Sequence, residues 1–411
     1  MKSAIRLLLA AIALTIGTAA SAADKSFSEI LRTAALANGL LPAKQLFVDT
    51  DQHLAAIGSA FFESKNLSLN GRIACRTCHL DAFGSGDGLP NAVGIFGTGE
   101  GPVRAFSKGK IVPRNTLPLW GRGGQGFDVF FWDGKVDFSG QRPMSQFGAD
   151  VPSPDPLLTA VHLPPVEIRE MIDDDADVSR FKTESPEQAE RLYARILTRL
   201  VETERAAMED LASSLDKPLT EIAFGDVARS IAAFIRSEFR LRDTDFHRFV
   251  FGDGQLSPDE IQGGLIFYGK GKCVNCHTGP YFSDFRFHAV PFPQLGFGKN
   301  GFGIDYGRFN VTFDPDDLYK FRTPPLFNVA STPPFGHSGS LSALRDAIVA
   351  HFDPLRNLDT DAMTALSRHE YYKRMAAVGE DFNLFSVLSD LEVTLVIEFL
   401  KTLSFSSDGP S

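Results

Sequence analysis

All four cysteines of this 411-residue chain lie in two copies of one pattern, C-x-x-C-H. This pattern attaches c-type haem, because the two thiols bond covalently to the porphyrin and the following histidine binds its iron. A four-cysteine zinc site and paired redox disulfides are the alternatives, but neither requires a histidine after each pair. We therefore predict two covalently attached haems, held by Cys75, Cys78 and His79 and by Cys273, Cys276 and His277.

The first 22 residues have the features of a secretory signal peptide. Lys2 and Arg6 precede an apolar run from Leu7 to Ile16 that is too short to span a bilayer, and the small residues 20–22 form a cleavage site. An uncleaved N-terminal anchor is the alternative. We expect cleavage near Ala22 and a periplasmic protein, which agrees with the attachment of c-type haem outside the cytoplasm.

Composition excludes several classes of protein. The chain is 43% hydrophobic and 22% charged, which is ordinary for a globular protein and unlike a disordered or multi-spanning one. Its net charge of -10, without basic runs, argues against binding nucleic acid or an anionic membrane surface. No later stretch of about 18 apolar residues suggests a membrane span.

Helical patterns dominate the remaining sequence. An apolar run over 54–62 precedes the first haem motif, and a capping box at 257–260 opens a helix before the second. Further helices are predicted after the cap at 185–188, over 224–239, and from a capping box at 389–392 to about Leu403. Long Gly/Pro/Phe-rich loops over 80–125 and 278–336 separate them, and loops of this length are usually functional. The predicted class is mainly α with long irregular loops that wrap the haems.

Several segments match one known family. They are Arg114-Asn115-Thr116, Phe130 to Gly134, Pro165-Val166-Glu167, the second haem motif with Gly279-Pro280, and Arg322-Thr323-Pro324 through His337-Ser338-Gly339. Over nearly the whole mature chain the sequence resembles the bacterial di-haem cytochrome c peroxidases and their relative MauG. The resemblance implies two cytochrome c-like domains, a peroxidatic one over 23–245 and an electron-transfer one over 246–411. The spacing of the motifs exceeds that of the family, and the excess falls in a helical insert around 172–215.

The resemblance also implies catalytic residues. Glu167 matches the base that takes a proton from H2O2 and returns it to the leaving oxygen; a solvated loop carboxylate, next to Arg169 and Glu170, is the alternative. Gln141 resembles a distal-pocket glutamine, although the local spacing is one residue short. Trp132 matches the tryptophan between the two haems, with a core tryptophan as the alternative, and Trp120 is expected in the core.

Axial ligation of the irons separates the branches of this family. At the position of the second haem's sixth ligand, where the peroxidases have Met and MauG has Tyr, the chain has His351, and no Met lies between Met208 and Met363. A buried or surface histidine is the alternative, with His288 or His337 as other ligands. No His or Met lies between Leu80 and Arg114 to cap the first iron. The first haem is therefore expected to be five-coordinate, as in MauG, and the second bis-His, which departs from MauG and fits a relative of the methanobactin-associated type.

A calcium ion between the haem domains is implied by resemblance alone, with Asn115, Thr332 and Pro334 at the matching positions. Oxygen ligands of this kind suit a hard cation.

Three functions are compatible with these features. The first is H2O2-driven oxidation of a Trp or Tyr in a partner protein. The second is reduction of H2O2 to water with electrons from a small redox protein. The third, a non-enzymatic electron carrier, is weakened by Glu167 and by the missing sixth ligand, since a pure carrier needs both irons saturated.

Overall fold

The computed structural model describes residues 26–68, 71–148, 150–173, 185–356, 358–379 and 385–405. The predicted signal peptide and part of the predicted insert lie outside these ranges. The mainly α class is confirmed, since helices form the framework and every strand is two residues long. None of the helices in the described ranges is both long and apolar enough to cross a bilayer.

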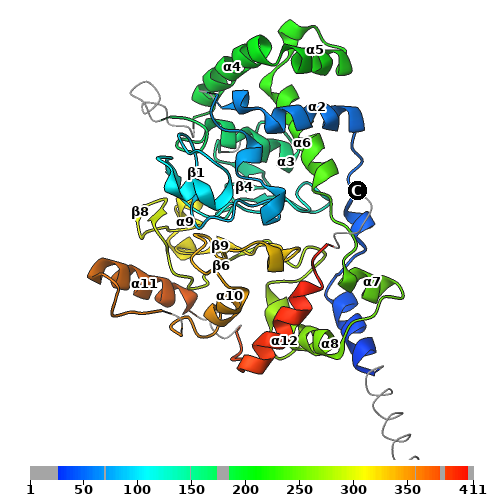
Figure 1. Cartoon of the computed structure of the whole chain (residues 1–411), viewed down its shortest axis with the longest axis vertical. Helices are drawn as coiled ribbons and strands as arrows, with labels where there is room; N and C mark the ends of the chain where they lie inside the picture. The colour runs from blue at the N-terminus through cyan, green and yellow to red at the C-terminus, as the bar shows by residue number, and fades with distance from the viewer. Residues whose placement is uncertain are drawn as a thin grey trace, which may run out of the picture.

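Two crossed helix pairs organise the molecule (Figure 1). We call the part of the structure that contains the first haem motif the first unit and the part that contains the second motif the second unit. In the first unit α2 (Gln52–Glu63) packs on α6 (Phe224–Glu238), and in the second unit α8 (Pro258–Tyr268) packs on α12 (Asp390–Lys401). Each crossing contains a glycine: a Cβ on Gly58 would lie 1.9 Å from the carbonyl oxygen of Ser230, and one on Gly263 would lie 1.9 Å from that of Leu395. The two units are therefore built alike, with the helix before each haem motif pressed directly onto a later helix.

The helix starts follow from capping side chains. Asp51 accepts hydrogen bonds from the backbone N–H groups of residues 53 and 54, which fixes the start of α2. Ser257 and Ser389 form the two predicted capping boxes with Glu260 and Glu392. The predicted helix after Ser185 is also present, although the Ser185 side chain makes no capping hydrogen bond.

Shorter helices and strands complete the framework. The other helices are one over residues 26–37, α3 (Pro156–His162), α4 (Pro186–Thr203), α5 (Arg205–Ser214), α7 (Asp245–Phe251), α9 (Phe309–Thr312), α10 (Leu344–Ala350) and α11 (Ala365–Val378). Antiparallel pairing joins β1 (Ala92–Val93) to β2 (Ile111–Val112), β3 (Val129–Phe130) to β4 (Val136–Asp137) and β4 to β5 (Met144–Ser145), β6 (Phe287–His288) to β9 (Phe321–Arg322), and β7 (Phe297–Gly298) to β8 (Gly301–Phe302). The loops predicted over 80–125 and 278–336 contain only such short elements.

The first described helix packs on the second unit. The carbonyl oxygen of Asn38, just after that helix, accepts hydrogen bonds from the backbone N–H of Gly279 and the hydroxyl of Thr278. Leu31 is fully buried and faces Gly264 of α8. The helix over residues 26–37 thus lies beside α7, α8 and α12, and the chain after it crosses to the first unit (Figure 1).

Buried ion pairs join the two units. Arg114 of the first unit binds Asp305 of the second through Nε and Nη2, both at 2.9 Å, and also contacts Asp133 at 2.5 Å. Arg308 binds Asp137 at 2.8 Å. Arg114 and Asp305 are almost wholly buried, and removing one partner of such a pair leaves an uncompensated charge in the interior. These pairs therefore hold the units in one relative position.

Candidate di-haem active site

Each haem motif forms a short 3-10 helix, Cys75–Thr77 in the first unit and Cys273–Asn275 in the second. Nδ1 of His79 donates to the carbonyl oxygen of Ser85 at 2.8 Å, and Nδ1 of His277 donates to that of Phe282 at 2.9 Å. These bonds leave Nε2 of each ring as the atom that could bind an iron. Burial lowers the pKa of both histidines to about 4, so both are neutral at pH 7, as iron ligation requires.

One large cavity contains the second motif. Cys273, Cys276 and His277 line it together with His351, and apolar side chains make up most of the wall, including Phe267, Val290, Leu326, Val329, Ile348 and Leu400. His351 directly follows α10, and its Nδ1 donates to the carbonyl oxygen of Ala347 at 2.7 Å. Burial lowers the pKa of His351 below its ordinary value. An apolar cavity with both cysteines and two neutral imidazoles fits a covalently attached haem with two histidine ligands.

The two alternative histidines also line this cavity but have their Nε2 atoms engaged. His337 Nε2 lies 2.9 Å from Oε1 of Gln294, and the ring stacks on Phe321. His288 Nε2 lies 2.8 Å from Oδ2 of Asp284, whose hydrogen bond raises the pKa of His288. Of the three, His351 is the one whose Nε2 makes no hydrogen bond within the described ranges.

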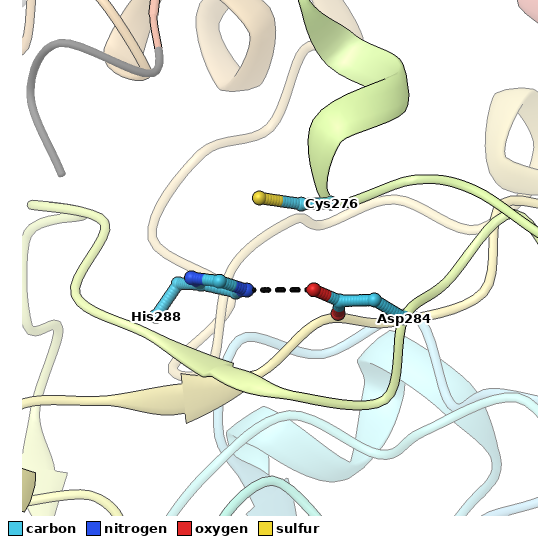
Figure 2. Close-up of side chains that lie close together, drawn as sticks. All are labelled: Cys276, Asp284 and His288. Atoms are coloured by element: carbon cyan, nitrogen blue, oxygen red, sulfur yellow. Dashed lines mark hydrogen bonds and ion pairs between the residues drawn. The ribbon is translucent and has the colours of Figure 1, made fainter.

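Figure 2 shows His288 and Asp284 beside Cys276, an arrangement of imidazole, carboxylate and thiol that could hold a metal ion. The Cys276 sulfur belongs to the second haem motif, so its thiol is used by the covalent link. The trio therefore marks the edge of the second haem site and not a separate metal centre.

The Glu167 segment is fixed against the loop that follows the first haem motif. Glu167 follows a 3-10 turn, Pro164–Val166. Two residues on, the carbonyl oxygen of Arg169 accepts from the backbone N–H of Ile95 at 3.1 Å. A Cβ on Gly94 would lie 1.9 Å from the same oxygen, so the two segments are in direct backbone contact.

Two carboxylates of this segment have opposite pKa shifts. Oε2 of Glu167 lies 3.0 Å from Nζ of Lys135. Burial favours the neutral form of Glu167, but the charges of Lys135 and Lys299 outweigh it and lower its pKa to about 2. For Glu170, burial and then the charge of Glu167 raise the pKa to about 7. Neighbouring groups separated in this way can divide acid and base roles.

Glu170 is a residue that sequence reasoning missed. In the sequence, Glu170 only suggests that the neighbouring Glu167 lies in a solvated loop. In the structure its negative charge helps to raise the pKa of both Cys75 and Cys78, so it lies within electrostatic reach of the first haem attachment. The sequence feature that could have indicated a role for Glu170 is its spacing of three residues from Glu167, directly after the apolar segment 163–166.

The two tryptophans occupy different sites. Trp132 lines the second-haem cavity and donates from Nε1 to the carbonyl oxygen of Asn115 at 2.9 Å. Trp120 donates to the carbonyl oxygen of Gly84 at 3.1 Å and packs on Phe239 and Phe405, as expected for a core residue.

Gln141 is exposed between β4 and β5, and among the described residues Glu167 forms its side-chain hydrogen bond with Lys135 and none with Gln141. Its catalytic role stays a prediction.

The three residues implied as calcium ligands, Asn115, Thr332 and Pro334, all line the same cavity. The side-chain amide of Asn115 lies 2.6 Å from the carbonyl oxygen of Pro334, and its backbone N–H donates to that of His337. Nδ2 of Asn115 is the donor in this contact, so a flip of the amide would bring Oδ1 next to the Pro334 oxygen, and two oxygen ligands of this kind would suit a hard cation.

Comparison with known proteins agrees with this geometry. A family model described as di-haem cytochrome c peroxidase matches residues 52–255. The cytochrome-c peroxidase IdrP1 of Pseudomonas sp. strain SCT is 24% identical over 71% of this chain and 70% of its own length. The methylamine utilization protein MauG of Paracoccus denitrificans is 26% identical over 86% of this chain and 89% of its own.

Solved structures show the same fold. The crystal structure of a MauG-like protein associated with microbial copper homeostasis superposes with a TM-score of 0.62 at 21% identity, covering 90% of this chain and 93% of that one. With two haem motifs, two neutral proximal histidines and these relatives, the chain belongs to the family of di-haem cytochrome c peroxidases and MauG and is a haem-dependent oxidoreductase that carries two c-type haems and reacts with H2O2.

Proposed function

We propose that this chain is a MauG-like enzyme of the periplasm that uses H2O2 to oxidise a Trp or Tyr side chain of a partner protein. When bound, the first haem supplies an open iron for reaction with H2O2 and the second stores or relays oxidising equivalents. The observation that carries the proposal is the shared cavity of His277 and His351. His277 and His351 would both hold the second iron, whereas residues 80–113 contain no His or Met that could hold the first.

The protein's own part in the reaction is proton handling. A peroxide oxygen can leave only after a proton moves from one oxygen atom to the other, and a carboxylate can carry that proton. Glu167 is ionised across the physiological range because Lys135 lies 3.0 Å away. Glu170, with a pKa of about 7, is balanced between its two forms. In this proposal Glu167 accepts the proton, Glu170 keeps it near the site, and Gln141 at most polarises the peroxide.

Electronic communication between the haems is assigned to Trp132. Its indole ring lines the second-haem cavity, and its N–H is held by Asn115 of the first unit. The proposed calcium ion binds beside it through Asn115, Thr332 and Pro334, where it would fix the same backbone. Removal of calcium by a chelator is then expected to slow the peroxide reaction and to be reversed by added Ca²⁺ but not by Mg²⁺.

A single-turnover experiment separates the two enzymatic functions. The oxidised holoenzyme is mixed with one equivalent of H2O2, with and without a reduced small electron-donor protein, and its absorption spectrum is followed. A MauG-like enzyme reacts at once without prior reduction and keeps its oxidising equivalents for seconds or longer. If the enzyme reacts only after its second haem is reduced, it is a peroxidase supplied by an electron donor, and the proposal is wrong.

A further inference from the structure

Two buried arginines near the junction of the units lack the carboxylate partners that buried charges normally require. Arg322 is 1% exposed and Arg122 is 7% exposed. Within the described ranges neither forms an ion pair, whereas Arg114 and Arg308 nearby bind aspartates. A buried charge without a partner is strongly unfavourable.

Arg322 is only partly satisfied by the backbone. Its Nε donates to the carbonyl oxygen of Phe131 at 2.9 Å and its Nη1 to that of Thr323 at 3.2 Å. Its Nη2 is buried and has no hydrogen-bond partner among the described residues. Because Arg322 lines the same cavity as Cys273, Cys276 and His277, an acceptor for Nη2 must come from whatever fills that cavity.

Arg122 lies close to Arg322, beside the wall of the second-haem cavity. Its Nε donates to the carbonyl oxygen of Pro118, a residue of the second-haem cavity wall. Both guanidinium groups lie over the ring of Phe127. The distance from Cζ to the centre of the ring is 5.7 Å for Arg122 and 5.9 Å for Arg322.

We propose that Arg322 and Arg122 form one anion-binding site whose ligands are propionates of the second haem, with Arg322 binding a propionate directly and Arg122 lying beside it. The thioether links fix one edge of each porphyrin at the cysteines, and the propionates extend from the edge away from them. A propionate carboxylate would supply the missing acceptor for Nη2, and bidentate pairing is the preferred geometry of a guanidinium with a carboxylate.

Such a site also influences redox chemistry. A positive charge beside the porphyrin favours the state with one more electron, so Arg322 would raise the reduction potential of the second haem. The proposal rests on haem attachment and not on the identity of the substrate, and its test needs no peroxide.

The test is a redox titration of the holoenzyme, followed by absorption at each haem, for the wild type, R322M, R322K, R122M and R104M. Arg104 is the matched control: it is also buried, but it is satisfied by the carbonyl oxygens of residues 93, 94, 97 and 99 and does not line the second-haem cavity. R322M is expected to lower the equilibrium constant for reduction of the second haem about tenfold, which is a fall of about 59 mV in its reduction potential for one electron. R322K should shift the potential of the second haem less, R122M should lower it in the same direction as R322M, and R104M should leave it unchanged.

Resonance Raman spectroscopy of the propionate bending modes is the second measurement. Changed modes in R322M, with two haems per chain in a haem assay, support the site. Unchanged modes together with an unchanged potential in R322M overturn it. If R322M does not accumulate, unchanged modes in both R322K and R122M overturn it equally. A wild-type potential that depends on added phosphate would also overturn it, because the site would then hold an exchangeable anion.

Discussion

Nζ of Lys135 lies 3.0 Å from Oε2 of Glu167, and this contact separates the chemistry of Glu167 from that of Glu170. The lysine side chain is 10% exposed and that of Glu167 is 23% exposed, so solvent screens their attraction only in part. Glu167 is thereby kept ionised. Burial of Glu170, together with the negative charge of Glu167, raises the pKa of Glu170 to about 7. The peroxide reaction is therefore expected to depend on all three residues.

Replacing Lys135 by Met should destabilise the protein by about 3 kcal/mol at pH 7, because a buried carboxylate loses its partner. The pKa of Glu167 is lowered to about 2, so the pair stabilises the fold above the ordinary pKa of 4.5 and loses this effect as the pH falls towards 2. The deficit of K135M should thus shrink below pH 4 in urea unfolding. Lys217→Met, which breaks the exposed pair with Asp226, is the control and should cost about 1 kcal/mol or less. A deficit that stays constant from pH 7 to pH 3 would contradict the role given to the pair.

Replacing Glu167 by Gln should slow the reaction with H2O2 by about 10²–10⁴-fold, the usual contribution of a positioned acid–base group. The resting absorption spectrum should be unchanged, since both proximal histidines remain. Stopped-flow mixing with a small excess of H2O2 measures the rate. A rate within about threefold of the wild type would assign the proton transfer to another group.

Replacing Glu170 by Gln tests the residue found only in the structure. Because its pKa is about 7, the wild-type rate should change with pH around neutrality. E170Q should remove that titration and leave the dependence on Glu167. The same stopped-flow measurement from pH 5 to pH 9 decides the matter, and an unaltered pH profile in E170Q would exclude Glu170 from proton transfer.

The resting oxidised enzyme should contain one high-spin and one low-spin haem. Residues 80–113 offer no His or Met to the first iron, whereas His277 and His351 share the second cavity. Electron paramagnetic resonance of the untreated protein distinguishes the two spin states. Two low-spin signals would show that the first iron has a sixth ligand from elsewhere in the chain.

Replacing His351 by Ala should convert the second haem to high spin. His162 provides a matched control, since its Nδ1 also donates to the carbonyl four residues earlier, at 2.7 Å. Its ring, however, packs against Tyr193 and Phe224 and does not line the second-haem cavity. H162A should therefore leave both spin states unchanged. A low-spin second haem in H351A would point to His288 or His337 as the ligand.

Local chemistry explains which features could be predicted from sequence. A haem motif places two thiols and an imidazole within five residues, and a capping box needs only Ser257 and Glu260 three residues apart. The helix starts could therefore be predicted and are confirmed, and the same local pattern predicts His79 and His277 as the proximal ligands. His351 could be predicted because the resemblance fixes its distance from His337 along the chain. In the structure His351 and His277 line the same cavity.

Features that depend on distant segments could not be predicted in this way. Arg322 and Arg122 are separated by 200 residues, so the sequence does not reveal that both lie buried without a carboxylate. The pKa of Glu170 likewise depends on burial and on the placement of Lys135. The packing of the first helix on the second unit uses hydrogen bonds to the carbonyl oxygen of Asn38 and the contact of Leu31 with Gly264, and these leave no sequence pattern.

The helix crossing at Gly58 gives a final prediction about the fold itself. A Cβ at this position would lie 1.9 Å from the carbonyl oxygen of Ser230, closer than any relaxed contact, so α2 and α6 would have to separate. Gly58→Ala should therefore destabilise the protein by about 1–3 kcal/mol despite the higher helix propensity of Ala. Gly225→Ala in α6, where the nearest atom is 4.0 Å away, is the matched control and should be neutral or stabilising by up to about 1 kcal/mol. A lower urea midpoint in G58A, with an unchanged slope, would confirm the prediction. Equal midpoints for the two variants would mean that the crossing can widen without loss of packing.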